Sequence, residues 1–63
     1  MTQKELLYLE DAVGHETSII KILNETLGML DDEKLVVFIE EEIDKHNSLK
    51  DELLNLLEDK ANG

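Results

Sequence analysis

The sequence contains no cysteine, and this absence excludes disulfide bonds and thiolate metal centres. A chain of 63 residues is small. A domain of this size buries only about 60% of the surface that its unfolded form exposes, so it usually needs a disulfide, a metal or a second copy for stability. Without cysteine, self-association becomes the default expectation. A metal held by His and carboxylate side chains is the remaining alternative.

Basic residues are also scarce, with 6 Lys and Arg against 16 Asp and Glu and a formal net charge of −10. A field of this sign repels the phosphates of nucleic acids and anionic membrane surfaces, so we expect neither as a partner. The longest apolar runs, Leu6 to Leu9 and Leu35 to Ile39, fall far short of the roughly 20 residues of a membrane span. The N-terminal residues do not read as a secretory signal, and we expect a cytoplasmic protein.

Aromatic side chains are few, since the chain has one Tyr, one Phe and no Trp to line a small-molecule pocket. The sequence also contains no nucleophile constellation, no phosphate-binding loop and no dinucleotide fingerprint. We therefore predict a protein without enzymatic activity and without a cofactor.

Proline is missing and glycine occurs three times, so a helix can run unbroken except near Gly28. Thr2 and Glu5 have the spacing of a capping box, in which a hydroxyl and a carboxylate each accept a free backbone N–H. This pair predicts that a first helix begins there and covers about residues 3–28.

The middle of the chain carries turn and capping residues. We expect Gly28 to end the first helix in a left-handed conformation and to begin a turn of about residues 28–32. Asp31 or Asp32 is well placed to cap a second helix over about residues 32–60.

Apolar residues recur alternately three and four positions apart in both halves, the spacing of a seam between packed helices. Two such helices joined by a short connection must lie antiparallel, so we predict an all-α fold with one helical-hairpin domain, residues 1–63. The first seam comprises Leu6, Leu9, Val13, Glu16, Ile20, Leu23, Leu27 and Leu30. The second comprises Leu35, Ile39, Glu42 or Ile43, His46, Leu49, Leu53 and Leu56 or Leu57.

Further apolar residues flank both seams, so each apolar face is wider than one helix contact can cover. The economical solution is an antiparallel four-helix bundle, a homodimer of two hairpins related by a twofold axis. The flanking residues are Leu7, Ala12, Ile19, Ile22, Met29, Val36, Val37, Phe38 and Leu54. We expect the oligomer interface to use Leu9, Val13, Ile20, Leu23, Leu27, Leu35, Ile39, Ile43, Leu49 and Leu53.

The polar exceptions in the two seams are predicted to coincide. With a turn near Asp31, residues whose numbers add up to about 62 lie level across an antiparallel hairpin, which places Glu16 beside His46. Glu42 lies one helical turn from His46, and His15 is next to Glu16. Gly14, a costly residue inside a helix, either admits a close neighbour or a bend beside this layer or is simply tolerated.

Three interpretations of these polar residues stay open. They can form a buried polar layer that fixes register and oligomer number. They can bind iron, manganese or zinc, with Glu16, His46, Glu42 and His15 as candidate ligands. They can also turn into solvent, where i,i+4 pairs such as Glu42 with His46 are worth only a few tenths of a kcal/mol.

Three short motifs carry a resemblance that covers about residues 5–50. They are Leu6-Leu-Tyr-Leu-Glu-Asp-Ala-Val-Gly-His-Glu16, Leu30-Asp-Asp-Glu-Lys-Leu35 and Asp44-Lys-His46. Together they resemble the first helical pair of the small spore-coat proteins of the coat-F type, which are similar to ferritin-like bundles. The resemblance implies half of a ferritin-like bundle, a spore association, and coat or other helical proteins as partners. The sequence departs from the Glu-x-x-His pattern of di-metal bundles, because Ile43 stands where the pattern requires Glu.

Overall fold

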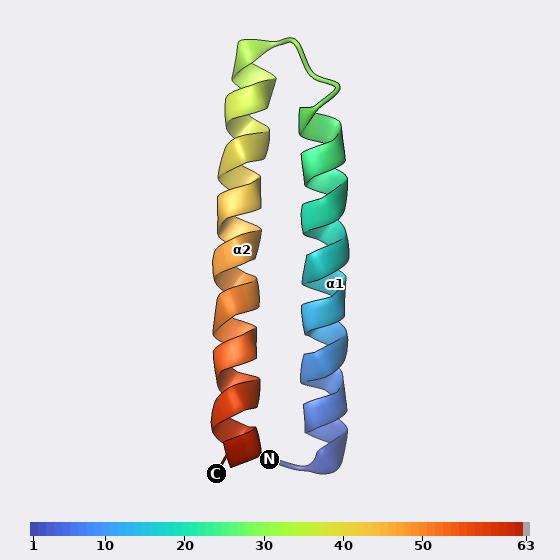
Figure 1. The fold of residues 1–63 in the computed structure, drawn as a ribbon, viewed down its shortest axis with the longest axis vertical. Helices are drawn as coiled ribbons and strands as arrows, with labels where there is room; N and C mark the ends of the chain where they lie inside the picture. Colours follow the sequence, from blue (N-terminus) through green and yellow to red (C-terminus); the bar gives the residue numbers. More distant parts are fainter. Residues whose placement is uncertain (63) are drawn as a thin grey trace.

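The computed structural model describes the backbone of residues 1–62 and the side chains of residues 1–60. Two helices, α1 (Gln3–Leu27) and α2 (Glu33–Asn62), pack against each other. They run antiparallel, so both chain ends lie at one end of a rod and the turn lies at the other (Figure 1). The rod measures 46 × 14 × 11 Å. The predicted all-α fold of two packed helices is confirmed.

The capping box at the start of α1 is also confirmed. The backbone N–H of Glu5 donates to the Thr2 hydroxyl at 3.1 Å, and the backbone N–H of Thr2 donates to Glu5 Oε1 at 2.8 Å. Two backbone donors that the helix leaves free are thereby satisfied, which fixes where α1 begins.

The end of α1 differs from the prediction. Gly28 has φ −66° and ψ −14°, a right-handed conformation, so the expected left-handed cap is wrong. Its N–H still bonds to the carbonyl of Asn24, and the N–H groups of Met29 and Leu30 bond three residues back to Thr26 and Leu27. The chain therefore leaves α1 through one tightened turn, which satisfies the last carbonyls without a positive φ.

Asp32, one of the two predicted capping residues, begins α2. Its Oδ1 accepts the backbone N–H groups of Lys34 and Leu35 at 2.9 and 3.1 Å. This is the geometry of an N-cap. Glu33 follows in the first turn, where a negative charge meets the positive end of the helix dipole.

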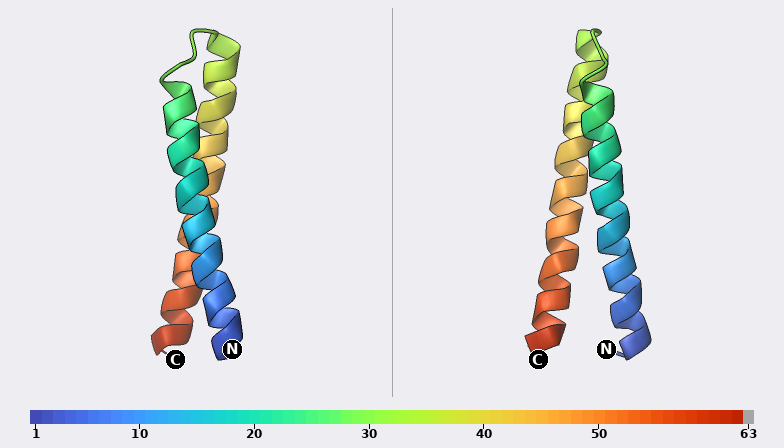
Figure 2. Two further views of the ribbon diagram at one scale, coloured as in Figure 1. Left: turned by 90° about the vertical axis from the view of Figure 1, so that its right-hand side faces the viewer. Right: turned by 45° about the vertical axis from the view of Figure 1, so that its right-hand side comes forward.

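Part of the seam predicted for α2 is wrong. Leu35 and Leu49 were expected inside but are 50% and 42% exposed, and of the alternatives Leu56 and Leu57 it is Leu57 that lies inside, while Leu56 is 47% exposed. The half-buried residues that form the seam are instead Val36, Ile39, Ile43, His46, Lys50, Leu53 and Leu57, which alternate three- and four-residue steps, and Glu42 is half-buried beside this seam. The two helices cross at a small angle (Figure 2), and the half-buried positions of α2 continue from Val36 to Leu57. The residues of the seam are therefore set by the continuous packing of the two helices and not by the hydrophobicity of single positions. Lys50 fits because its aliphatic stem can lie along the seam while its ammonium reaches water.

This seam gives the hairpin two unlike faces. Heptads of the two seams begin at residues such as Val13 of α1 and Ile43 of α2, which are called a positions. In an antiparallel pair, the residues one position before the a positions of both helices, such as Ala12 and Glu42, lie on the same side. We call this side the apolar face, and a shallow groove lined by Glu5, Tyr8, Leu9 and Leu56 shows that it spans both helices. The apolar face comprises Tyr8, Ala12, Ile19 and Ile22 of α1 and Leu35, Phe38, Leu49 and Leu56 of α2, with Glu42 in its middle.

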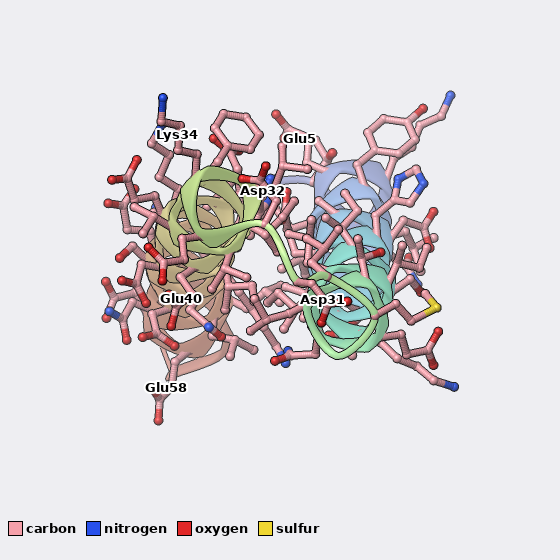
Figure 3. All side chains as sticks on the ribbon, turned by 90° about the horizontal axis from the view of Figure 1, so that it is seen from above. Glu5, Asp31, Asp32, Lys34, Glu40 and Glu58 are labelled. Carbon is pink, nitrogen blue, oxygen red and sulfur yellow. The ribbon has the colours of Figure 1, made fainter. Side chains whose placement is uncertain are left out.

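The opposite side, which we call the polar face, carries mostly amides, hydroxyls and carboxylates. Viewed along the rod, carbon-rich side chains fill the space between the helices, and the carboxylate of Glu58 projects outward from α2 (Figure 3). The polar face comprises Glu10, Thr17 and Asn24 of α1 and Glu33, Glu40 and Asn47 of α2, with Leu7, Val37 and Leu54 as its exposed apolar exceptions.

Gly14 lies on an exposed part of α1. A Cβ added to it would meet nothing within 4 Å, so within the hairpin it admits no close neighbour. The hydroxyl of Ser18 donates to its carbonyl at 3.2 Å.

Candidate functional site

Glu16 of α1 and His46 of α2 face each other across the seam, as the predicted register requires. His46 Nδ1 lies 2.5 Å from Glu16 Oε2. Both residues stand near the middle of their helices, so the contact divides the apolar seam about halfway along the rod. The depth of this polar pair therefore follows from the hairpin register alone.

Burial singles out this pair. Over residues 1–60, Glu16 is the one residue classed as buried, at 9% exposure, and no apolar side chain is fully enclosed. The Glu16 carboxylate has His46 as its hydrogen-bonding partner. A hairpin whose most enclosed side chain is a carboxylate has a seam but no apolar core of its own.

Glu42 completes the cluster from the apolar face. Its Oε2 lies 3.9 Å from His46 Nε2, one helical turn away, and its Oε1 lies 3.3 Å from the ammonium of Lys45. The side chains of Glu42 and His46 are each 27% exposed. The ring of His46 thus has a carboxylate near each nitrogen: Glu16 on the seam side and Glu42 toward the apolar face.

The hydrogen-bonding roles follow from the partners. An ionised carboxylate has no proton to donate, so an ionised Glu16 requires the proton on Nδ1 of His46. In the neutral imidazole, Nε2 then carries the free lone pair. This lone pair lies on the side of Glu42.

The structure brings together three of the four predicted ligands and leaves the fourth apart. His15 is exposed and lies outside the cluster. Within the described side chains, no three His, Asp or Glu residues are arranged to hold one metal ion. The reason is geometric, because Glu16 and Glu42 lie at different nitrogens of the His46 ring and cannot share an ion with it.

Two residues near the cluster were not predicted. Lys45 pairs with Glu42 at i,i+3 spacing, a signal that the sequence does carry. Lys50 occupies the seam one turn beyond His46, and only the unbroken step pattern of α2 would have indicated it.

The predicted interface residues fall into two groups. Those half-buried in the seam within one chain are Leu9, Val13, Ile20, Leu23, Leu27, Ile39, Ile43 and Leu53. Leu35 and Leu49 lie instead on the apolar face and are free to meet another molecule.

Over residues 1–62, neither helix carries an apolar stretch long enough to cross a membrane. Comparison with known proteins finds no family model, no curated protein and no solved structure that matches this chain.

Proposed function

We propose that this chain works as a homodimeric four-helix bundle with a structural or protein-interaction role. The observation that carries the proposal is that most of the exposed apolar side chains lie on the apolar face. Leu35, Leu49 and Leu56 stand in one row on the apolar face, whereas the matching row of the polar face is Glu33, Glu40, Asn47 and Leu54. An apolar face of this kind, flanked by charged residues, is typical of a helix-packing interface.

The surface area supports the same proposal. The hairpin exposes 4933 Å². A compact protein of 7.2 kDa exposes about 4100 Å² by the relation between mass and area, so the hairpin exposes roughly 800 Å² more. A stable interface buries about 800 Å² from each partner, which is the same amount.

A second copy of the chain is the partner that fits both charge and shape. Two hairpins stacked with their apolar faces together bury both rows of leucines and leave both polar faces in water. Closed twofold dimers are the commonest soluble oligomers, and they need only one self-complementary surface. Most of the acidic side chains behind the net charge of −10 per chain stay on the outside, where they oppose further association.

The proposed biological setting is the bacterial spore or the cytoplasm, and it rests on the resemblance of residues 5–50 to small spore-coat proteins of the coat-F type. A dimer of this kind would be a cytoplasmic or spore-associated component that contacts other coat or helical proteins. No catalytic role is proposed.

The test compares two matched substitutions. Leu49 and Leu54 are both leucines of α2 with exposures of 42% and 41%, but they lie on the apolar and polar faces respectively. We expect Leu49→Glu to convert the dimer to a largely unfolded monomer and Leu54→Glu to leave the mass unchanged, both measured by size-exclusion chromatography with light scattering. Equal behaviour of the two variants would contradict the assigned interface.

The alternative function is metal binding by a ferritin-like bundle with a degenerate site and residual redox activity. The contact of Glu16 with His46, and Glu42 beside it, is the observation that favours it. Within one chain the cluster offers too few ligands, so metal binding depends on what a second copy adds.

A further inference from the structure

The cluster of Glu16, His46 and Glu42 gains a further role when two hairpins associate. This inference rests on the proposed dimer. Glu16 and His46 lie near the midpoints of both helices. When two rods of equal length stack face to face about a twofold axis, their midpoints come level whether the turns lie at the same end or at opposite ends. The two copies of the cluster therefore meet at the centre of the bundle.

The charge at that centre is unbalanced. Each copy brings two carboxylates, and within residues 1–60 the basic side chains in salt-bridge range of them are His46 and Lys45. The side chain of Lys45 is 71% exposed, so it neutralises Glu42 only from the rim. Burying four carboxylates with so little positive charge is unfavourable, and a bound cation offsets this penalty.

The imidazole is already oriented for a metal. Histidine ligands usually donate their second ring N–H to a carboxylate, which fixes the tautomer and raises the basicity of the ligating nitrogen. Glu16 stands in this position at Nδ1 of His46. The remaining nitrogen, Nε2, lies on the side of the ring that faces Glu42.

The spacing of the two donors also fits. Zinc binds His nitrogen and carboxylate oxygen at about 2.0–2.2 Å, so two ligands of a tetrahedral ion lie about 3.3–3.5 Å apart. His46 Nε2 and Glu42 Oε2 lie 3.9 Å apart. Both side chains are partly exposed, and a small rotation of the carboxylate closes the difference.

We infer that the dimer binds one divalent transition-metal ion between its copies, through His46 Nε2 and the Glu42 carboxylate of each. Glu16 is a positioning residue and not a ligand. Two protein ligands from each copy complete a four-coordinate site, which a single hairpin cannot do. The ion would stabilise the dimer and fix the register of the two hairpins.

The first experiment is calorimetric titration of untagged, EDTA-dialysed protein with zinc chloride. We expect one zinc per two chains in the wild type, and no stoichiometric binding in His46→Leu or Glu42→Gln. His15→Ala is the matched control, because His15 also follows an acidic residue, Asp11, by four positions but is exposed on α1. Absence of zinc binding in the wild type, or equal loss in the His15 variant, would overturn the inference.

A second readout tests the role of Glu16. In metal-free protein, at a pH where the His46 imidazole is neutral, its ¹⁵N shifts are expected to report the proton on Nδ1, and Glu16→Gln is expected to remove this preference. The same substitution should weaken zinc binding by roughly 10–100-fold, the effect usual for a group that supports a ligand. Unchanged zinc affinity together with an unchanged tautomer would show that Glu16 has no such role.

Sedimentation in EDTA separates this inference from the proposed function. A metal-free dimer that binds no zinc leaves the bundle intact and removes the metal site. A monomer in EDTA that stays helical contradicts the bundle, and a dimer that gains stability with zinc supports both.

Discussion

The Glu5 carboxylate accepts the backbone N–H of Thr2 at 2.8 Å, and this hydrogen bond lowers the pKa of Glu5 below its ordinary value, with smaller contributions from the Thr2 hydroxyl and the N-terminus. A lowered pKa in the folded state means that the ionised carboxylate stabilises the fold. This contribution is complete above the unfolded pKa and is lost as the pH falls through the folded pKa.

The capping box of α1 is therefore expected to open in acid before the rest of the helix. An NMR titration of the Glu5 side chain, with amide exchange of the first turn, measures this effect. Thr2→Ala keeps the backbone N–H but removes the hydroxyl, so it should return the pKa of Glu5 only part of the way toward its ordinary value. A wild-type pKa at the ordinary value would exclude the proposed hydrogen bond in solution.

Gly14 gives a second prediction for a single residue. Because a Cβ there meets nothing within 4 Å, Gly14→Ala should gain the helix propensity of alanine without a clash. We expect the free energy of unfolding to rise by roughly 0.5–1 kcal/mol per chain, measured by urea denaturation at fixed protein concentration. A loss of stability would mean that another molecule approaches α1 at this point.

Lys50 shows where reasoning from single residues fails. We predicted Leu49 in the seam because it is apolar. In the structure Lys50 lies in the seam instead, because it continues the alternation of three- and four-residue steps after His46. A lysine can occupy a seam position near the surface with little cost, whereas a break in the seam would affect every contact beyond it.

The start of each helix is marked by capping residues that can be recognised in the sequence. The capping box of α1 and the cap of α2 were predictable because they depend on neighbours two or three residues away. The right-handed end of α1 at Gly28 was not, since glycine permits a left-handed cap without requiring it. The path of the turn is decided by how α2 docks on α1, which is a tertiary effect.

The cap of α2 is testable with a pair of adjacent aspartates. Asp32→Ala removes the acceptor for two backbone N–H groups and should lower stability by about 1 kcal/mol per chain. Asp31→Ala is the control, because the capping bonds come from Asp32, and it should change stability little. Thermal unfolding followed by circular dichroism measures both. Similar losses in the two variants would assign the effect to charge and not to the cap.

At the scale of the molecule, the depth of Glu16 and His46 was predictable from hairpin register, because a short turn between antiparallel helices fixes which residues are level. The contact of the His46 ring with Glu42 and the separate position of His15 were not predictable, because both depend on side-chain orientation. The division into an apolar and a polar face was not predictable either, because it depends on which residues of α2 form the seam.

A double substitution tests what the polar layer does in the bundle. In EDTA, where no metal is bound, replacing Glu16 and His46 together with Leu removes a buried polar pair and should raise the melting temperature, since apolar side chains of similar size often stabilise such sites by about 1–4 kcal/mol. The same change should broaden the distribution of oligomer masses, because the layer that fixes register is gone. Circular dichroism and native mass spectrometry record the two effects. A sharp loss of folding would show that the layer is needed for stability itself.

The central claim is that the apolar face is covered by a second copy of the chain. Sedimentation equilibrium of the untagged protein in EDTA tests it most directly. We predict twice the chain mass of 7.2 kDa, with dilution producing monomer only together with loss of helix, because the hairpin encloses no apolar side chain within its described residues. A helical particle of 7.2 kDa at every concentration would contradict the claim.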